Sequence, residues 1–234
     1  MKKLIQFIPN LFTLGNLFCG CLAVLSIFQE NYLWTVIFVL SGAFLDFFDG
    51  FLARLLKVSG PLGKELDSLA DMVTFGVVPG LIVFHFLAIE LPESYEYLKY
   101  TGFLITLASA YRLANFNIAT NQTDEFIGVP VPANTLFFLS FCLFEGQTDT
   151  ISSFLFLPQT MIACSLVFSY LLNAKFPLIA LKFKSFGWKG NEFKWALILM
   201  AVALGVILQA KSLPFIILGY VLLSVIKNGV QKKA

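Results

Sequence analysis

Histidine, cysteine and charge are all scarce in this chain of 234 residues. Its one histidine, His85, lies within an apolar stretch, and we expect it to pack or hydrogen-bond between helices rather than act as a base. The four cysteines also lie in apolar stretches and lack C-x-x-C spacing. This pattern disfavours a zinc site or a disulfide framework and predicts small buried apolar side chains instead. A net charge of only +2 disfavours a nucleic-acid partner.

Apolar residues, by contrast, dominate the chain: 58% are hydrophobic, 13% are charged and 27 are phenylalanine. A soluble domain of this length is far less apolar, so the composition predicts a membrane protein. The short apolar stretch before Pro9 is not followed by a small-residue cleavage site, and we expect no signal peptide.

Stretches of about 20 apolar residues are long enough to cross a bilayer as helices. About eight such stretches are present, with six or seven as the alternatives because the fifth, seventh and eighth are short. We therefore predict an all-α, polytopic membrane bundle forming a single domain over residues 1–234. The stretches are residues 11–28, 33–56, 66–89, 98–119, 129–145, 151–173, 195–210 and 213–229.

Lysine and arginine indicate the orientation, because translocated loops tend to lack them. With the N-terminus inside, 14 of the 16 lysines and arginines fall on the cytoplasmic side, which leaves Lys99 and Lys211 outside. Both termini are then cytoplasmic, and we expect a bacterial inner membrane. The segment 175–194 carries five lysines among aromatic residues. It is either an interfacial segment that attracts anionic lipid or an ordinary positive-inside loop with aromatic anchors.

Four aspartates interrupt the apolar pattern at Asp46, Asp49, Asp67 and Asp71. A charged carboxylate near the bilayer centre costs at least ~3 kcal/mol, so four of them require a polar cavity and a neutralising partner. Asp46 and Asp49 share one helix face, as do Asp67 and Asp71. A turn at residues 59–61 can bring the two faces together on the cytoplasmic side.

Carboxylate oxygens without histidine or cysteine favour hard cations such as Mg²⁺ or Mn²⁺, with Ca²⁺ as an alternative. Two such ions can clamp a phosphate and its leaving group during an in-line displacement. The alternative is salt bridging by Arg54, Lys57 and Lys64, but three cations do not balance four aspartates and Glu65.

The spacing D-x2-D-G-x2-A-R-x8-G-x3-D-x3-D is complete between residues 46 and 71 and closely resembles the signature of the CDP-alcohol phosphotransferases. The resemblance implies a helical membrane enzyme that displaces CMP with an alcohol, using Mg²⁺ or Mn²⁺. It also implies that the four aspartates are metal ligands and that Asp71 is the general base. The residues that it places against the CDP moiety are Gly50, Ala53, Arg54 and Gly63.

Three further segments, 8–20, 111–117 and 126–133, resemble the bacterial branch of that family whose acceptor alcohol is serine. The resemblance implies transfer of the phosphatidyl group from CDP-diacylglycerol to L-serine, giving phosphatidylserine and CMP. Alternative acceptors are glycerol 3-phosphate, inositol or its phosphate, and choline. We also expect a homodimer surrounded by membrane lipids.

Polar residues that flank the motif are further candidates for the site. Thr13 and Asn16 lie at the inner end of the first span. They either hydrogen-bond the nucleotide or belong to a capped helix start whose buried polar groups are hydrogen-bonded by neighbouring residues. Arg112 and Asn117 lie at the inner end of the fourth span, where a guanidinium can bind a phosphate or the serine carboxylate. The alternative for Arg112 is a positive-inside anchor without a role in the site.

Two other classes of function remain as alternatives at this point. Intramembrane carboxylates also mark cation or proton transporters, although such groups are expected near mid-membrane in broken helices rather than beside a cytoplasmic turn. A non-catalytic lipid-binding or assembly protein would not need all four aspartates.

Overall fold

A computed structural model describes residues 2–58, 60–118, 126–179, 187–188 and 191–231. Ser59 of the expected turn and part of the basic segment, residues 180–186 and 189–190, lie outside the described residues. The helices are α1 (Lys2–Phe28), α2 (Tyr32–Leu56), α3 (Pro61–Asp71), α4 (Val78–Glu90), α5 (Phe103–Ile118), α6 (Val131–Phe144), α7 (Thr150–Leu155), α8 (Pro158–Asn173), α9 (Glu192–Leu208) and α10 (Leu213–Gln231).

Shorter elements connect these helices. They are the π-helix η1 (Met72–Val77), the 3₁₀ helices η2 (Glu93–Gly102) and η3 (Gln209–Ser212), and the two-residue strands β1 (Phe126–Ile127) and β2 (Pro177–Leu178). The strands pair antiparallel, with Phe126 opposite Leu178. Each of the eight predicted stretches contains a helix, so the all-α membrane fold is confirmed.

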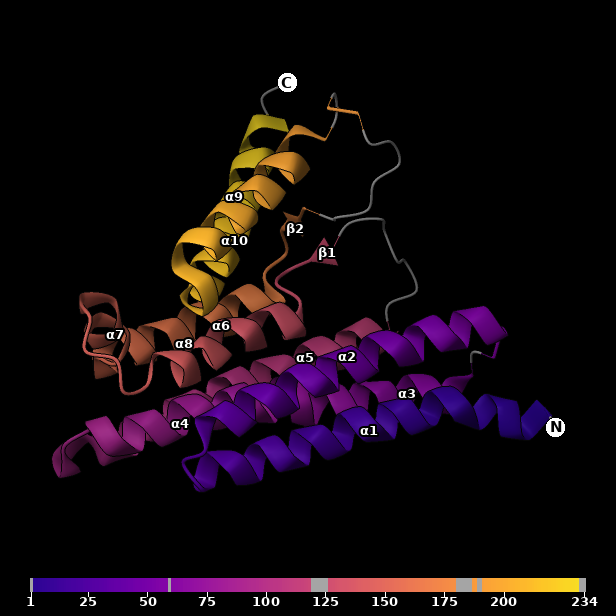
Figure 1. Cartoon of the computed structure of the whole chain (residues 1–234), viewed down its shortest axis with the longest axis horizontal. Coiled ribbons are helices and arrows are strands. Elements are labelled where there is room, and N and C mark those ends of the chain that lie inside the picture. The colour runs from indigo at the N-terminus through magenta and orange to yellow at the C-terminus, as the bar shows by residue number, and fades with distance from the viewer. Residues whose placement is uncertain (1, 59, 119–125, 180–186, 189–190, 232–234) are drawn as a thin grey trace.

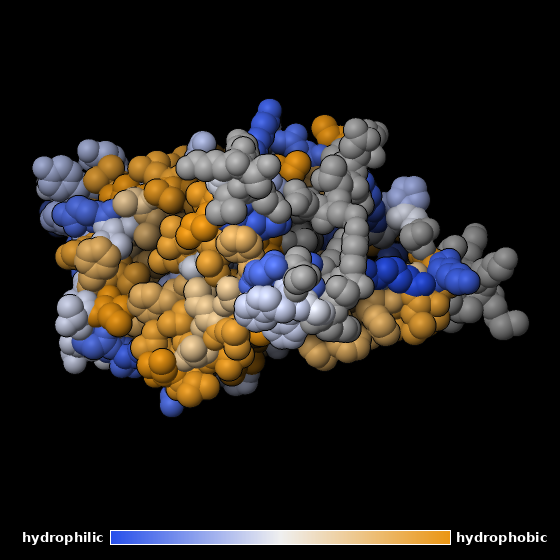
Figure 2. Space-filling model, turned by 90° about the horizontal axis from the view of Figure 1, so that it is seen from above, coloured by the Kyte–Doolittle hydropathy of each residue, from blue (hydrophilic) through white to orange (hydrophobic). Residues whose placement is uncertain are grey.

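Four stretches within the described residues are long and apolar enough to cross a membrane, and Val131–Phe144 is a shorter apolar helix. The four are Phe7–Phe28, Tyr32–Leu56, Pro61–Glu90 and Glu192–Gly229. In the space-filling view, hydrophobic residues cover much of the surface, and hydrophilic residues form separate patches among them (Figure 2). This distribution is the one expected of an integral membrane protein.

The arrangement places α1 to α5 side by side along the long axis, whereas α9 and α10 form a pair that rises steeply from them (Figure 1). Helix α6 lies at the centre and is buried on almost every side. Its Phe137 stacks on Phe168 of α8 with ring centroids 4.1 Å apart. Phenylalanine therefore supplies the core as well as much of the apolar surface.

Two predicted spans differ in detail from the sequence-based expectation. The stretch 151–173 is divided into α7 and α8, because Pro158 begins a new helix and cannot continue the ladder of the preceding one. The stretch 98–119 starts inside η2 and becomes α-helical only at Phe103. Of the four cysteines, Cys142 is buried as expected, but Cys21 is exposed.

A tight hairpin joins α2 to α3 and positions the aspartates. Helix α2 ends at Leu56, and the following residue, Lys57, caps it: its conformation is left-handed (φ 53°), and its N–H bonds back to the carbonyls of Ala53 and Arg54. Gly60 is extended, and Pro61 starts α3 at a position where a missing N–H costs nothing. The turn reverses the chain direction, α1 packs against both α2 and α3, and both aspartate pairs lie near the same end of the bundle.

Candidate active site

The carboxylates of α2 and α3 converge at this hairpin. Potential ligand oxygens of Asp46, Asp49 and Asp67 all lie within 4.8 Å of one another. Asp49 is buried, and the other two are half-buried. The carboxyl of Asp46 is also within hydrogen-bonding reach of those of Asp67 and Asp71. The structure therefore brings all four predicted residues into one cluster, which Asp71 joins by its contact with Asp46.

The chemistry of this donor set fits a hard divalent cation. Among the described residues, one group of at least three acidic, histidine or cysteine side chains lies close enough together to share an ion. Its members are Asp46, Asp49 and Asp67. Oxygen ligands of this kind suit Mg²⁺, Mn²⁺ or Ca²⁺. The two basic side chains nearest in sequence do not neutralise the cluster in this structure: Arg54 donates to a backbone carbonyl, and so does Lys64.

Helix α1 supplies hydrogen-bond donors to two of the aspartates. The hydroxyl of Thr13 donates to Oδ2 of Asp49 at 2.5 Å, and Nδ2 of Asn16 donates to Oδ1 of Asp71 at 3.1 Å. Both donors are buried. The backbone carbonyl of Asn16 accepts a further hydrogen bond from Thr74 of η1 at 3.0 Å. Thr13 and Asn16 therefore hold the carboxylates in place, a role that the sequence did not indicate; their contact with the nucleotide stays a prediction.

The π-helix η1 begins directly after Asp71. Its wider turn disrupts the regular backbone ladder, and side chains of neighbouring helices compensate. Thr135 of α6 donates to the carbonyl of Phe75 at 2.8 Å, and Thr106 of α5 donates to the carbonyl of Gly76 at 3.0 Å. π-Helical turns are frequent at functional sites, where they rotate one part of a helix relative to the next. Here the rotated part carries Asp71.

The motif residues predicted to contact CDP lie on the same hairpin. Arg54 is exposed and donates from Nε to the carbonyl of Gly50 at 2.9 Å. A Cβ added at Gly50 would meet only the Arg54 guanidinium, at 3.9 Å, so this face of α2 has room for a ligand. At Gly63 an added Cβ would lie 3.3 Å from Oδ1 of Asn10, a tighter approach between α3 and α1. Ala53, which lies between Gly50 and Gly63 in the sequence, is half-buried.

The guanidinium of Arg112 is hydrogen-bonded to backbone carbonyls. Its guanidinium donates to the carbonyl of Ile127 at 2.8 Å, that of Gly128 at 3.1 Å and that of Leu172 at 2.5 Å. Gly128 has a φ of +68°, and an added Cβ would lie 2.8 Å from the guanidinium. Arg112 thus joins the end of α8 to the segment before α6. Its predicted role toward serine or phosphate is untested by these contacts.

Asn117 lies against α3 on the side of the aspartates. Its Oδ1 accepts from the hydroxyl of Ser68 at 3.1 Å, and its backbone carbonyl accepts from Lys64 at 2.5 Å. Ser68 directly follows Asp67 in the chain. The structure therefore places Asn117 against α3, the helix that carries Asp67 and Asp71, and Ser68 is a neighbour that the sequence did not single out.

Comparison with known proteins identifies the class that this fold and site define. The model of the family described as CDP-alcohol phosphatidyltransferase matches residues 6–226. The chain belongs to this family, and the resemblance seen in the motif is confirmed.

Several relatives are named for the serine reaction. The CDP-diacylglycerol–serine O-phosphatidyltransferase of Bacillus subtilis is 36% identical over 174 residues, covering 73% of this chain and 88% of that protein. The protein of the same name from Helicobacter pylori is 30% identical over 216 residues, covering 87% and 84%. An archaetidylserine synthase of Methanothermobacter thermautotrophicus is 28% identical over 170 residues, covering 70% of each chain.

Proposed function

We propose that this protein is an enzyme that transfers the phosphatidyl group of CDP-diacylglycerol to L-serine, releasing phosphatidylserine and CMP. The observation that carries the proposal is the cluster of four motif aspartates at one end of a helical membrane bundle. The names of the relatives from B. subtilis and H. pylori support serine as the acceptor. Family membership disfavours the transporter and the non-catalytic alternatives.

In this reaction the serine hydroxyl attacks the phosphatidyl phosphorus, and the bond from that phosphorus to the CMP oxygen breaks. We assign proton acceptance to Asp71, which Asn16 holds by the 3.1 Å hydrogen bond to its Oδ1. A carboxylate is a suitable base when it lies within hydrogen-bond reach of the attacking hydroxyl.

We assign the four aspartates to two Mg²⁺ or Mn²⁺ ions. Bound there, these ions would neutralise the diphosphate and the charge that develops on CMP. The residues assigned to the nucleotide are Gly50, Ala53, Arg54, Gly63, Thr13 and Asn16, and those assigned to the acceptor or lipid phosphate are Arg112 and Asn117.

We further propose that the site faces the cytoplasm of a bacterial inner membrane and that the working unit is a homodimer of single-domain chains. The positive-inside bias supports the orientation. Lipid tails would then enter between helices, while serine and CMP exchange with the cytosol.

The test is an assay of CMP release by the purified protein with CDP-diacylglycerol and, separately, serine, glycerol 3-phosphate, inositol, inositol phosphate and choline. We expect CMP and phosphatidylserine with serine and little product with the other alcohols. EDTA should abolish the reaction, and Mg²⁺ or Mn²⁺ should restore it better than Zn²⁺. Product with glycerol 3-phosphate or an inositol but not serine would refute serine as the acceptor. Full activity in EDTA would refute the metal assignment.

A further inference from the structure

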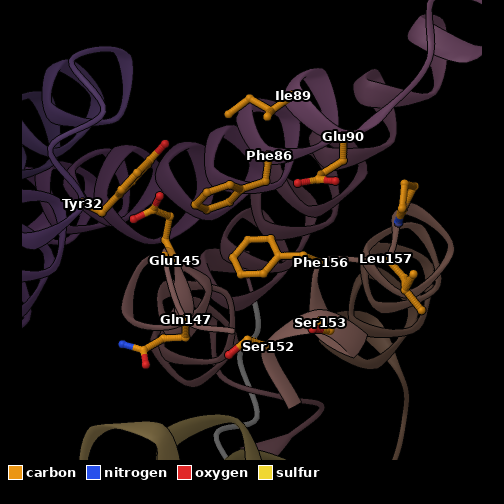
Figure 3. A pocket seen from close by; sticks show the side chains of 12 residues that line it. Tyr32, Phe86, Ile89, Glu90, Glu145, Gln147, Ser152, Ser153, Phe156 and Leu157 are labelled. Carbon is orange, nitrogen blue, oxygen red and sulfur yellow. The ribbon is translucent and has the colours of Figure 1, made fainter. Parts of the chain in front are cut away.

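A second cavity lies at the end of the bundle opposite the aspartates. It has a volume of about 390 Å³ and is lined by the ends of α2, α4, α6, α7 and α8 (Figure 3). Tyr32, in its wall, is 14 residues before Asp46 on the same helix, so the two sites are roughly 20 Å apart along α2. The volume is in the range of small-molecule sites. Nothing in the transfer reaction uses this cavity.

Three aromatic rings form one wall. The ring of Phe86 lies 5.1 Å from that of Tyr32 and 5.0 Å from that of Phe156, centroid to centroid. The hydroxyl of Tyr32 is hydrogen-bonded to Nε2 of His85 at 2.9 Å, which fixes the Tyr32 ring. The first pair is tilted and the second is edge-on, and aromatic rings present electron-rich faces that attract organic cations.

Two carboxylates face these rings. Glu145, just after α6, points toward Tyr32 and Phe86, and Glu90, at the end of α4, points back toward Phe86 from the other side (Figure 3). In the part of the chain that the structure describes, neither glutamate forms an ion pair. The lysines described at this end are engaged elsewhere, Lys99 with Glu96 and Lys211 with a carboxylate outside the cavity lining.

That second carboxylate is Asp149, which lies in the loop between α6 and α7. The Lys211 ammonium, together with the backbone N–H of Ser152, lowers the pKa of Asp149 to about 2. This ion pair is therefore charged on both sides at neutral pH, and Lys211 is not available to neutralise Glu145. Glu90 and Glu145, which are both exposed, therefore have no ion-pair partner among the described residues and lie beside the aromatic wall.

We propose that this cavity binds an organic ammonium group, with the charge of the ligand facing Glu90 and Glu145 and its alkyl groups resting on the aromatic rings. Metal binding is less suited to the site, because the described residues place three or more close ligand atoms only in the aspartate cluster. A carboxylate pair with aromatic rings instead matches the recognition of primary and quaternary amines. The ammonium group can belong to a lipid headgroup or to a soluble amine.

The test uses choline chloride and its neutral isostere 3,3-dimethyl-1-butanol, in which carbon replaces nitrogen. Isothermal titration of the full chain in detergent should give saturable heat with choline and none with the isostere. Glu90→Gln and Glu145→Gln should each weaken choline binding about tenfold, the effect of losing roughly 1.4 kcal/mol of charge attraction. Glu93→Gln, which removes a nearby carboxylate outside the cavity, should bind choline normally.

Each variant is also checked for its thermal midpoint and for CMP release, which should match the parent because the cavity is remote from the aspartates. Equal binding of the isostere, normal choline binding by both glutamine variants, or no saturable heat at all would overturn the proposal. Binding of CaCl₂ that depends on both glutamates, without binding of choline, would assign the cavity to a metal ion and would also overturn it.

Nanodiscs separate the two sources of the ligand. If the ammonium belongs to a lipid, nanodiscs that contain phosphatidylethanolamine should suppress choline binding relative to nanodiscs of phosphatidylglycerol alone. If it belongs to a soluble amine, choline should bind equally in both. Either result supports recognition of an ammonium group.

Discussion

At the scale of single residues, the central feature is the concentration of carboxylates in an apolar setting. Thr13 and Asn16 donate to Asp49 and Asp71, but two neutral donors do not neutralise four charges. The carboxylate-only donor set suits hard divalent cations. Asp46, Asp49 and Asp67 lie close enough together to share one such ion, and the proposed function assigns divalent ions to the cluster.

The division of labour among the aspartates gives a first prediction. Asp71→Asn removes the proposed base but keeps the shape and one oxygen, so turnover should fall at least ~10²-fold while CDP-diacylglycerol still binds in the presence of metal. Asp46→Asn should instead weaken binding of metal and nucleotide, because Asp46 lies in the three-carboxylate group. Turnover and nucleotide binding are measured for both variants, and near-normal turnover of Asp71→Asn would reassign the base.

Arg112 gives a second prediction, because it has two candidate roles. Arg112→Lys keeps the charge but loses the planar fork that reaches three carbonyls, so the thermal midpoint should fall. If Arg112 also holds the serine carboxylate, the KM for serine should rise well above any change in the KM for CDP-diacylglycerol. Equal weakening of both substrates would assign Arg112 to the lipid phosphate. A lower midpoint with both constants unchanged would leave it a structural residue.

The aspartates could be predicted from sequence because their spacing places them on helix faces beside a turn. The contacts of Asn16 and Arg112 could not, since their partners lie 55 and up to 60 residues away and are chosen by packing. The sequence suggests that Arg112 is a free cation near the membrane surface, whereas in the structure its guanidinium donates hydrogen bonds to three backbone carbonyls. A local pattern does not report that kind of partner.

At the scale of elements, the helical stretches could be predicted from apolar length, but their internal geometry could not. The π-helix η1 lies within a continuous apolar run, so the periodicity contains no signal of the wider turn. Its carbonyls are satisfied by threonines on α5 and α6. The shape of the helix that carries Asp71 therefore depends on two other helices.

Close packing of α1 against η1 gives a third prediction. A Cβ at Gly20 would collide with the hydroxyl of Thr74 and lie 3.1 Å from its backbone N and Cα, so Gly20→Ala must push the two elements apart. Overpacking of this kind costs about 1–3 kcal/mol. We expect a lower thermal midpoint and reduced turnover. Gly205→Ala is the matched control, because nothing lies within 4 Å of its added Cβ. Equal behaviour of both variants would contradict this role for the contact.

At the scale of the whole molecule, the two ends of the bundle differ in chemistry. Arg54, Lys57 and Lys64 flank the aspartate cluster in the chain, whereas Glu90 and Glu145 line the cavity at the opposite end of α2. The sequence predicted an orientation in the membrane from charge bias alone, and that orientation stays a prediction. It did not predict the steep angle of α9 and α10 to the other helices, which depends on how α10 packs on β2 through Tyr220, Ser224 and Asn228.

The orientation gives a fourth prediction. In a cysteine-free background, single cysteines at Gly60 and Gly187 should react with a membrane-impermeant thiol reagent only from the cytoplasmic side, and one at Ser94 only from the opposite side. Gly60 and Gly187 have no atom within 4 Å of an added Cβ, so these substitutions should not disturb packing. Labelling of the Gly60 and Ser94 sites from the same face would contradict the proposed topology.

The most direct test of the account follows the oxygen of serine. With L-serine labelled with ¹⁸O in its hydroxyl, the proposed attack on the phosphatidyl phosphorus places the label in the phosphatidylserine ester linkage, and CMP is released without label. Mass spectrometry of both products after incubation with CDP-diacylglycerol and Mg²⁺ or Mn²⁺ measures this. We expect labelled phosphatidylserine and unlabelled CMP in equal amounts. Serine linked to the cytidylyl phosphorus, with phosphatidic acid as the other product, or the absence of serine-dependent CMP release, would contradict it.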